Sequence, residues 1–396
     1  MRMTLWRNAN IATPNGLWTD GYLLVDMNGM IREVGKENQP GSLRGAMESI
    51  GIEWDLGGRL VLPGLIDVHV HGGGGFEVMG GDYDELDGMS RFHAANGTTS
   101  FLATTMTDSQ GALEKTLAGI ARAKVEGLSG AELLGAHLEG PFLNALRAGA
   151  QNKAHLADPD ERMIAQLLKA ADGCIRLVTL APELPGGPVA VERFRSAGAT
   201  VSAGHTDATF AQMEEAVRQG VTHTTHHFNG MRPMHHREPG AAGAGLLLPE
   251  LTIELIADGM HVHPELIRMA FLTKPVSRIC MVTDAVKCAG LPDGAYGDIV
   301  MRDGCVMSKD GSTLAGSSLT MLKALRNTLR FTGLPLLQVL SAFTSVPARQ
   351  IGLEGRKGTI EAGKDADFIV VNGDYELLKT VVRGRTIVEQ DRTRRT

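Results

Sequence analysis

Histidines and carboxylates stand at the ends of several apolar runs in this 396-residue chain. The first run reads Pro-Gly-Leu-Ile-Asp-Val-His-Val-His and carries His69 and His71. Residues i and i+2 share one face of a strand, so these two imidazoles can point at one spot. A metal ion needs nitrogen and oxygen ligands that converge from several rigid elements. Four further runs end in the same way, at Glu139, His205, His226 and Asp284. Five such ends favour a metal site over a chance His-X-His.

The composition is that of an ordinary globular enzyme. Hydrophobic residues make up 43% and charged residues 21% of the chain. The net charge of −6 argues against a general nucleic-acid or membrane role, so the site of an anionic substrate must supply positive charge locally. The four cysteines form no Cys-X-X-Cys pair, and the first residues lack a long apolar core. We therefore expect no signal peptide or transmembrane helix and a cytoplasmic protein.

The central part of the chain alternates apolar runs with amphipathic helical patterns, as at residues 112–124, 159–171 and 210–219. The predicted strands are residues 61–71, 98–105, 132–139, 175–182, 200–205, 221–226, 252–258 and 277–284. Eight strand–helix units predict an α/β fold, a (β/α)₈ TIM barrel over residues 61–350. The alternative is a doubly wound open sheet. The barrel is favoured because chemical residues recur at the ends of at least six strands, whereas an open sheet gathers them at one switch point.

Both termini contain only short strand-like runs. Those of the first part are residues 5–9, 21–25 and 29–35, and those of the last part are residues 358–360, 366–371 and 381–388. Neither piece is large enough for a good core of its own. We expect residues 1–60 and 351–396 to combine into one small β-sandwich domain that the barrel interrupts.

Taken together, these motifs give the chain a strong family resemblance. It resembles the amidohydrolase superfamily and, more narrowly, the N-acetylglucosamine-6-phosphate deacetylases, over its whole length. The start of the barrel, with its His-X-His, is the general mark of the superfamily. The more specific marks lie at residues 138–144, 204–206, 226–229, 237–240, 257–261 and 314–317.

The resemblance implies one or two divalent metal ions per subunit. Many relatives bridge two metals with a carboxylated lysine, but this branch uses a glutamate, and Glu139 stands at that position. With Glu139, the residues His205 and His226 resemble the ligands shared across the branch. The second cation would be held by His69, His71 and Asp284. Zinc suits these ligands best, and iron fits the same set.

The resemblance also implies the chemistry of Asp284. A metal lowers the pKa of bound water to about 7, which makes hydroxide available at neutral pH. A nearby carboxylate can take the proton of that water and deliver it to the departing amine. We expect Asp284 to be this general acid–base. By contrast, His227 points to the strand face opposite His226, so we expect it to pack in the interior and not to bind metal. We assign no ligand role to His137 or His223.

Substrate contacts are implied only through the resemblance. They are Ala150, Gln151, Asn229, Gly230, Arg237, Asp258, His261, Leu314, Ala315 and Gly316. Arg237 resembles an arginine that binds the sugar phosphate across a dimer interface, so a homodimer is implied. Gln151 is a departure, because the family often has a histidine there. Its amide can donate a hydrogen bond but carries no positive charge, so polarisation of the carbonyl would depend more on the metal.

The expected function is removal of acetate from N-acetylglucosamine 6-phosphate to leave glucosamine 6-phosphate. The sequence does not separate this sugar from its N-acetylgalactosamine epimer. A dihydroorotase or hydantoinase acting on a cyclic amide is an alternative, which the bridging glutamate and the Arg-Glu-Pro-Gly run disfavour. A non-catalytic sugar-phosphate sensor is another, which a complete set of ligands plus Asp284 disfavours.

Overall fold

Eight parallel strands form a barrel in the computed structural model, which describes residues 3–38 and 50–390. In ring order they are β5 (Leu65–Val70), β8 (Thr98–Thr104), β9 (Glu132–Glu139), β10 (Ile175–Leu180), β11 (Thr200–Ala203), β12 (His223–Thr224), β13 (Thr252–Ile256) and β14 (Ile279–Val282). Beyond the two end strands, the Asp284 amide donates to the His69 carbonyl at 2.9 Å, and Val70 pairs with Ala285 in parallel. These contacts close the ring. The predicted TIM barrel is confirmed.

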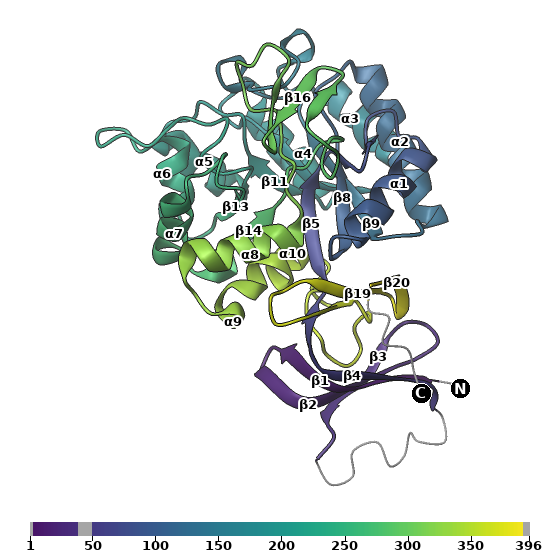
Figure 1. The fold of residues 1–396 in the computed structure, drawn as a ribbon. Coiled ribbons are helices and arrows are strands. Elements are labelled where there is room, and N and C mark those ends of the chain that lie inside the picture. Colours follow the sequence, from purple (N-terminus) through teal and green to yellow (C-terminus); the bar gives the residue numbers. More distant parts are fainter. Residues whose placement is uncertain (1–2, 39–49, 391–396) are drawn as a thin grey trace.

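A helix follows each barrel strand and covers the outside of the ring (Figure 1). The helices are α1 (Tyr83–Ala94), α2 (Gln110–Glu126), α3 (Glu161–Ala171), α4 (Gly187–Ser196), α5 (Phe210–Gln219), α6 (Gly240–Leu247), α7 (Pro264–Thr273) and α8 (Met321–Thr332). Local sequence explains several boundaries. Helix α5 begins with a capping box between Thr209 and Gln212 and ends at Gly220, whose φ is 113°.

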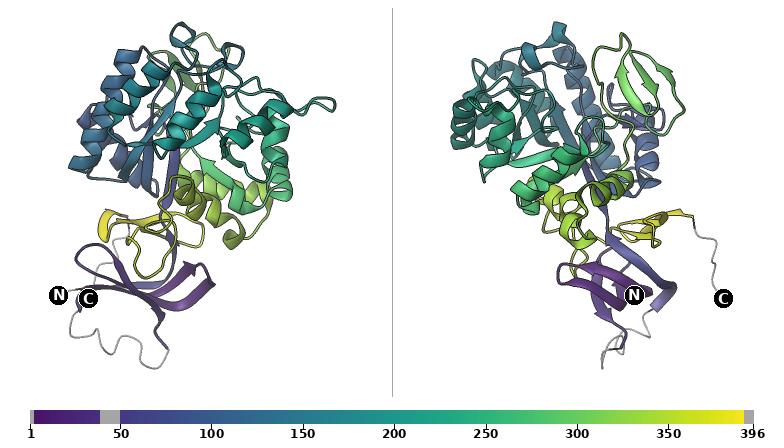
Figure 2. Two further views of the ribbon diagram at one scale, coloured as in Figure 1. Left: turned by 180° about the vertical axis from the view of Figure 1, so that it is seen from behind. Right: turned by 60° about the vertical axis from the view of Figure 1, so that its left-hand side comes forward.

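Both chain ends build a second sheet below the barrel (Figure 2). Its seven described strands, in order, are β20 (Arg385–Glu389), β19 (Leu377–Val382), β18 (Phe368–Val371), β4 (Ile50–Pro63), β1 (Met3–Thr13), β2 (Gly16–Val25) and β3 (Ile31–Lys36). Trp6 and Phe368, which belong to opposite ends of the chain, meet in its core with ring centroids 5.1 Å apart. Residues 1–2, 39–49 and 391–396 of the predicted terminal domain lie outside the described residues.

Three details of the predicted strands are wrong. Residues 61–71 are not one strand, because the chain leaves β4 at Pro63 and enters β5 at Leu65. Gly64 lies between them, where a Cβ would come within 2.0 Å of the Thr99 hydroxyl. Residues 381–388 form a hairpin, because Arg383 and Gly384 adopt positive φ. Residues 358–360 form a loop.

A small antiparallel sheet stands over the open end of the barrel and was not predicted. It comprises β15 (Gly294–Tyr296), β16 (Ile299–Arg302) and β17 (Cys305–Ser308), inserted between β14 and α8. Figures 1 and 2 place it at the end of the barrel opposite the terminal sheet. The terminal sheet therefore closes the base, and this insertion roofs the mouth.

Among the described residues, no single helix has the length and apolarity needed to cross a membrane. One sharply bent pair, Met321–Thr332 with Leu336–Gln350, passes that test jointly, on length and composition alone.

Candidate metal centre

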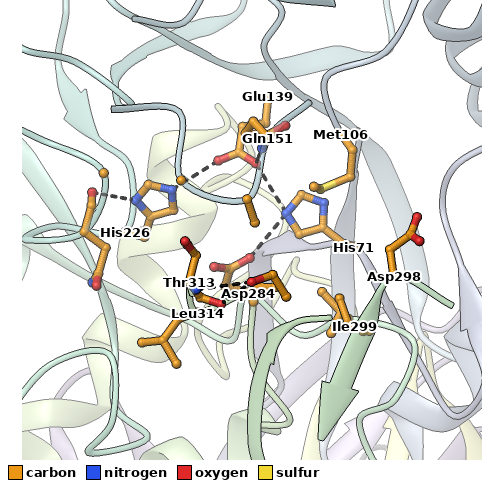
Figure 3. Close-up of a pocket in the computed structure, with 18 of the residues that line it drawn as sticks. His71, Met106, Glu139, Gln151, His226, Asp284, Asp298, Ile299, Thr313 and Leu314 are labelled. Atoms are coloured by element: carbon orange, nitrogen blue, oxygen red, sulfur yellow. Dashed lines mark hydrogen bonds and ion pairs between the residues drawn. The ribbon is translucent and has the colours of Figure 1, made fainter. Parts of the chain in front are cut away.

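Six predicted side chains meet at the mouth of the barrel in two groups of three, and Figure 3 labels His71, Glu139, His226 and Asp284 among them. Within each group the ligand atoms all lie within 4.8 Å of one another, and every member is buried. The first group is Glu139, His205 and His226, and the second is His69, His71 and Asp284. They come from β5, β9 and the residues just after β11, β12 and β14. The convergence of side chains predicted from the strand ends is therefore present.

Strained backbone aims three of these side chains into the barrel. His205, His226 and Asp284 have positive φ values of 45°, 30° and 51°, a region that residues other than glycine seldom adopt. Each such residue costs on the order of 1–3 kcal/mol and persists only where its surroundings hold it. All three stand two residues beyond the end of a strand, where the chain turns back across the mouth. Strain concentrated in this way is typical of a functional site.

The rings of His205 and His226 turn bare nitrogen atoms toward each other. His205 Nδ1 lies 2.8 Å from the carbonyl oxygen of Arg147, and His226 Nδ1 lies 3.1 Å from that of Asn229. A carbonyl oxygen only accepts, so each Nδ1 must carry the hydrogen. In the neutral rings both Nε2 atoms are then lone-pair acceptors, yet they lie 3.0 Å apart. A cation between them removes this repulsion.

The second pair of histidines repeats the arrangement. His69 Nδ1 lies 2.9 Å from a carboxylate oxygen of Glu254, and His71 Nδ1 lies 3.2 Å from the carbonyl oxygen of Thr104. Their Nε2 atoms are 3.3 Å apart. Four imidazole lone pairs therefore face the same small space, each ring held from behind by an acceptor. This is how proteins orient histidine ligands of a metal.

The carboxylate of Glu139 lies between the four rings. Its Oε1 is 3.5, 3.4 and 3.3 Å from Nε2 of His69, His205 and His226, and its Oε2 is 3.4 Å from that of His71. Oε1 is buried and has no hydrogen-bond donor. A buried acceptor without a donor is costly, and a carboxylate facing imidazole nitrogens is a donor set that zinc and iron prefer. The residues present therefore fit a divalent cation.

The electrostatics of the site favour positive charge. Burial opposes protonation of His71, but the carboxylates of Asp284 and Glu139 outweigh it and raise its pKa to about 9. The pKa of His69 is raised well above its usual value, because Glu139, Asp284 and Glu254 outweigh its burial. Burial would raise the pKa of Asp284, but His69 and His71 lower it to about 2. A metal ion competes with protons for the same negative potential.

A buried chain of polar groups supports His69 from behind, and its key member, Glu254, was missed in the sequence. Glu254 on β13 accepts from His69, from His223 Nε2 at 3.1 Å and from the His226 amide at 3.0 Å. His223 Nδ1 in turn lies 3.2 Å from Oε1 of Gln350. A lone glutamate within the apolar run Thr-Ile-Glu-Leu-Ile was the signal. Such a residue orients the metal ligands rather than binding the metal.

The histidines that received no ligand role lie outside the two groups. His137 is buried in the barrel, with Nε2 2.7 Å from the hydroxyl of Thr179. His227 is buried on the other side of the chain, with Nδ1 3.1 Å from the hydroxyl of Thr224. Burial lowers the pKa of His227 to about 3, so the ring is neutral. His227 therefore packs in the interior, as expected from the sequence, and His137 belongs to neither group of candidate ligands.

The metal cluster forms the floor of a cavity of about 540 Å³ beneath the roofing sheet. This volume lies in the range of small-molecule sites. Most of the predicted substrate contacts line it, namely Ala150, Gln151, Asn229, Gly230, His261, Leu314, Ala315 and Gly316. Other lining residues were not predicted, and they come from the segments after the first, second and last barrel strands and from the roof: Glu77, Met79, Met106, Lys287, Tyr296, Asp298 and Ile299.

Two of the predicted contacts lie away from the cavity wall. Asp258 stands behind His261, with Oδ2 2.6 Å from its Nδ1, and so orients a ring that does line the cavity. Arg237 is exposed on the loop before α6, which projects from the side of the barrel (Figure 1). Within one chain it reaches no part of the cavity lining.

Gln151 contacts the metal cluster through Glu139. Its Oε1 accepts the Thr107 amide at 2.7 Å, which fixes the orientation of the side chain. Its Nε2 then donates to Oε2 of Glu139, also at 2.7 Å. One N–H of Gln151 is therefore committed to holding the Glu139 carboxylate, and the Gln151 side chain still lines the cavity.

The comparisons with known proteins agree with this geometry. A model of the amidohydrolase family matches residues 60–387. N-acetylglucosamine-6-phosphate deacetylase of Bacillus subtilis is 37% identical over 391 residues, which is 96% of each chain. N-acetylgalactosamine-6-phosphate deacetylase of Escherichia coli O157:H7 is 34% identical and aligns over 83% of this chain and 87% of its own. A solved structure of a Mycobacterium smegmatis N-acetyl-D-glucosamine-6-phosphate deacetylase mutant with N-acetyl-D-glucosamine-6-phosphate is 32% identical, with a TM-score of 0.90 over 98% of this chain and 100% of that one.

Proposed function

The chain belongs to the amidohydrolase family, and we propose that it hydrolyses the acetamide bond of N-acetylglucosamine 6-phosphate. The products are acetate and glucosamine 6-phosphate. The observation that carries this proposal is the pair of histidine–carboxylate groups on the floor of the cavity, with bare imidazole nitrogens turned inward. The likeness of the whole chain to deacetylases of this substrate supports the choice of reaction.

Glu139, His205 and His226 would hold the first divalent cation, and His69, His71 and Asp284 the second. We propose zinc, with iron as the alternative, because both accept imidazole and carboxylate ligands. When bound, such a cation polarises the acetyl carbonyl and lowers the pKa of water. The protein contributes the rigid rings, the Glu139 carboxylate between them, and a roof that limits access of bulk water.

Asp284 is proposed as the general acid–base. Its Oδ1 lies 3.2 Å from Nε2 of His71 and 3.5 Å from Nε2 of His69, at the centre of the cluster and on the cavity wall. Its lowered pKa keeps the side chain ionised at neutral pH, ready to take a proton from water. The proton then passes to the amine nitrogen, because an unprotonated amide nitrogen is a very poor leaving group.

The sugar phosphate is proposed to bind on the side of Asn229, Gly230 and His261, with Leu314, Ala315 and Gly316 closing over it. His261 is suited to an anion, because the carboxylate of Asp258 outweighs its burial and raises its pKa. Gly230 has a φ of 57° and no side chain to cover its backbone N–H. We propose that Arg237 completes the site of a neighbouring subunit in a homodimer, since it does not line the cavity of its own chain.

We also propose that the enzyme works in the cytoplasm, with residues 1–60 and 351–396 as one domain and residues 61–350 as the other. Four cysteines remain free thiols, and three of them, Cys174, Cys280 and Cys288, are buried. Buried unpaired thiols are typical of proteins from a reducing compartment.

The test is release of acetate from both epimeric sugar phosphates by the purified metal-loaded enzyme. The proposal predicts a higher kcat/KM for N-acetylglucosamine 6-phosphate than for N-acetylgalactosamine 6-phosphate. The reverse preference would favour the second epimer as substrate, for which the Escherichia coli relative is named. Hydrolysis of a dihydroorotate or hydantoin, without acetate release from either sugar, would contradict the proposal.

A further inference from the structure

We propose that the cavity has a separate acyl compartment, and that the enzyme also hydrolyses N-propionyl and N-butyryl amino-sugar phosphates. The compartment is formed by Met79, Met106 and Ile299, which line the cavity and are not among the predicted contacts. This inference rests on the proposed function, because it assumes that the acyl carbonyl lies over the metal cluster.

The order of strands in the barrel puts the two ends of a substrate on opposite sides. Asn229 and Gly230 follow β12, and His261 follows β13, the sixth and seventh strands of the ring. Met79 follows β5 and Met106 follows β8, the first and second strands. In a closed ring of eight, the centres of these two sectors lie three strands apart, so β12 lies directly across the mouth from β8 while β13 and β5 are nearer to each other.

The close-up of the cavity agrees with this topology. Figure 3 places Met106, Asp298 and Ile299 on the His71 side of Glu139 and Asp284, with His226 on the other side. A substrate whose sugar and phosphate lie toward Asn229 and His261 has its amide over the cluster. The acyl chain then points toward the two methionines.

The lining of this compartment suits a short alkyl chain of variable length. Met79 and Met106 are partly exposed to the cavity, and Ile299 of β16 faces it from the roof. Methionine is unbranched and polarisable, so it adapts its shape to ligands of different size. An acetyl methyl group alone needs far less apolar surface than three such side chains provide.

Charged residues limit how long the chain can be. The same cavity is also lined by Glu77 and Lys287, whose charged atoms lie 3.4 Å apart, and by Asp298, which Figure 3 places on the same side as Met106 and Ile299. An alkyl chain that reached them would remove water from charges without replacing its hydrogen bonds. The compartment therefore favours short alkyl chains and excludes long fatty-acyl groups.

The reaction is the same hydrolysis for each acyl group. Oxygen from water bonds to the acyl carbon, and the bond between that carbon and the amine nitrogen breaks. The nitrogen takes up the proton that Asp284 received from the water. Acetate, propionate or butyrate leaves, together with the same amino-sugar phosphate.

The test compares kcat/KM of the metal-loaded enzyme for N-acetyl, N-propionyl, N-butyryl and N-octanoyl glucosamine 6-phosphate. We expect the propionyl and butyryl values to lie within about tenfold of the acetyl value, because apolar contacts of the added methylenes with the adaptable methionines offset the discrimination that a fitted pocket would show. The octanoyl value should be at least about a hundredfold lower. Hydrolysis of the acetyl compound with butyryl hydrolysis more than about a hundredfold slower would overturn the inference while leaving the proposed function intact. Without any acetate release, the proposed function itself fails.

Two variants make the test specific to the compartment. Met106→Phe should lower the ratio of butyryl to acetyl kcat/KM about tenfold by filling space, and Met79→Ala should raise it. The control is Met27→Ala. Met27 is 73% exposed and lies in the terminal domain, away from the cavity, so its replacement should leave the ratio of butyryl to acetyl kcat/KM at the wild-type value. If neither Met106→Phe nor Met79→Ala moves the ratio, the acyl chain does not lie where we place it.

Discussion

Strand β9 has a glutamate at each end that belongs to a cluster of carboxylates or histidines, and the two clusters differ in how their charge is balanced. At the base of the barrel, Glu132 lies with Asp365 and Asp367, within the same distance limits that mark a possible metal site. At the mouth, Glu139 lies among four imidazoles. Both clusters are made of residues that bind metals, so residue type alone does not distinguish them.

The cluster at the base already contains its cations. The ammonium of Lys357 lies 2.6 Å from Glu132 and 3.0 Å from Asp365, and it also pairs with Asp367. Arg356 pairs with Glu132 and lies 2.7 Å from Asp365. Lysine and arginine thus occupy the space that a metal would take and tie the terminal sheet to the barrel. This cluster is a structural ion network.

The cluster at the mouth has acceptors facing acceptors. The rings of His205 and His226 bring two bare nitrogens to 3.0 Å, and Oε1 of Glu139 has no donor. Nothing in the described protein supplies positive charge there except protons on the histidines themselves. The comparison shows that the balance of donors and acceptors, more than the ligand residue types, indicates where a cation binds.

The largest expected effect is at the mouth. Asp284→Asn should lower kcat by about a thousandfold, because the amide cannot take a proton from water. Circular dichroism and metal analysis should show a folded protein that retains most of its metal. Near-normal turnover in this variant would remove Asp284 from its proposed role.

At the base, the effect should fall on stability instead. Lys357→Met should destabilise the fold by about 3–5 kcal/mol, because it removes the cation of the buried Asp367 and leaves Arg356 alone to pair with Glu132 and Asp365. Denaturant unfolding would measure this change. The metal content and kcat of the folded fraction should stay at wild-type levels, and loss of metal without loss of stability would reverse our assignment of the two clusters.

The two glutamates of β9 give a matched pair. Glu139→Gln should weaken metal binding at least about tenfold, since the amide loses the charge that faces the rings. Glu132→Gln, seven residues earlier in the same strand, should leave the metal content unchanged. Competition with a metal-binding dye would measure the metal affinity of both variants. Equal affinities would contradict the assignment of metal binding to Glu139.

A smaller effect is expected at the residue that holds Glu139 in place. Gln151→Ala should lower kcat/KM about tenfold, because Oε2 of Glu139 loses its donor. The exposed Gln338 on the far side of the barrel supplies the control Gln338→Ala, which should not differ from the wild type. Full activity in Gln151→Ala would show that catalysis does not depend on the hydrogen bond from the Gln151 amide to Glu139.

The smallest effect concerns the loop before α6. Arg237→Ala should raise KM about tenfold with little change in kcat, because it removes a guanidinium from substrate binding alone. A mixture that forms heterodimers of Arg237→Ala and Asp284→Asn subunits should recover activity with a wild-type KM. In such a dimer one site has both Asp284 and the partner arginine. No recovery in verified heterodimers would contradict an arginine shared between subunits.

The sequence predicted what depends on local pattern and left out what depends on distant partners. The barrel strands and their ligand-bearing ends follow from apolar periodicity, and the exact limits of α5 follow from its caps. The roofing sheet was missed because its strands are only three to four residues long, too short to show a period-two pattern. Glu254 and Gln151 acquire their roles from residues 185 and 12 positions away, which no local pattern indicates.

The central claim is that the mouth of the barrel binds a divalent metal and that the reaction depends on it. The most direct measurement is acetate release from N-acetylglucosamine 6-phosphate by one preparation, followed through chelation and reconstitution, with metal content determined at each step. We predict one to two ions per subunit, loss of acetate release together with the metal, and recovery with zinc or iron. A chelated protein that is metal-free by elemental analysis and still releases acetate at the original rate would contradict the claim.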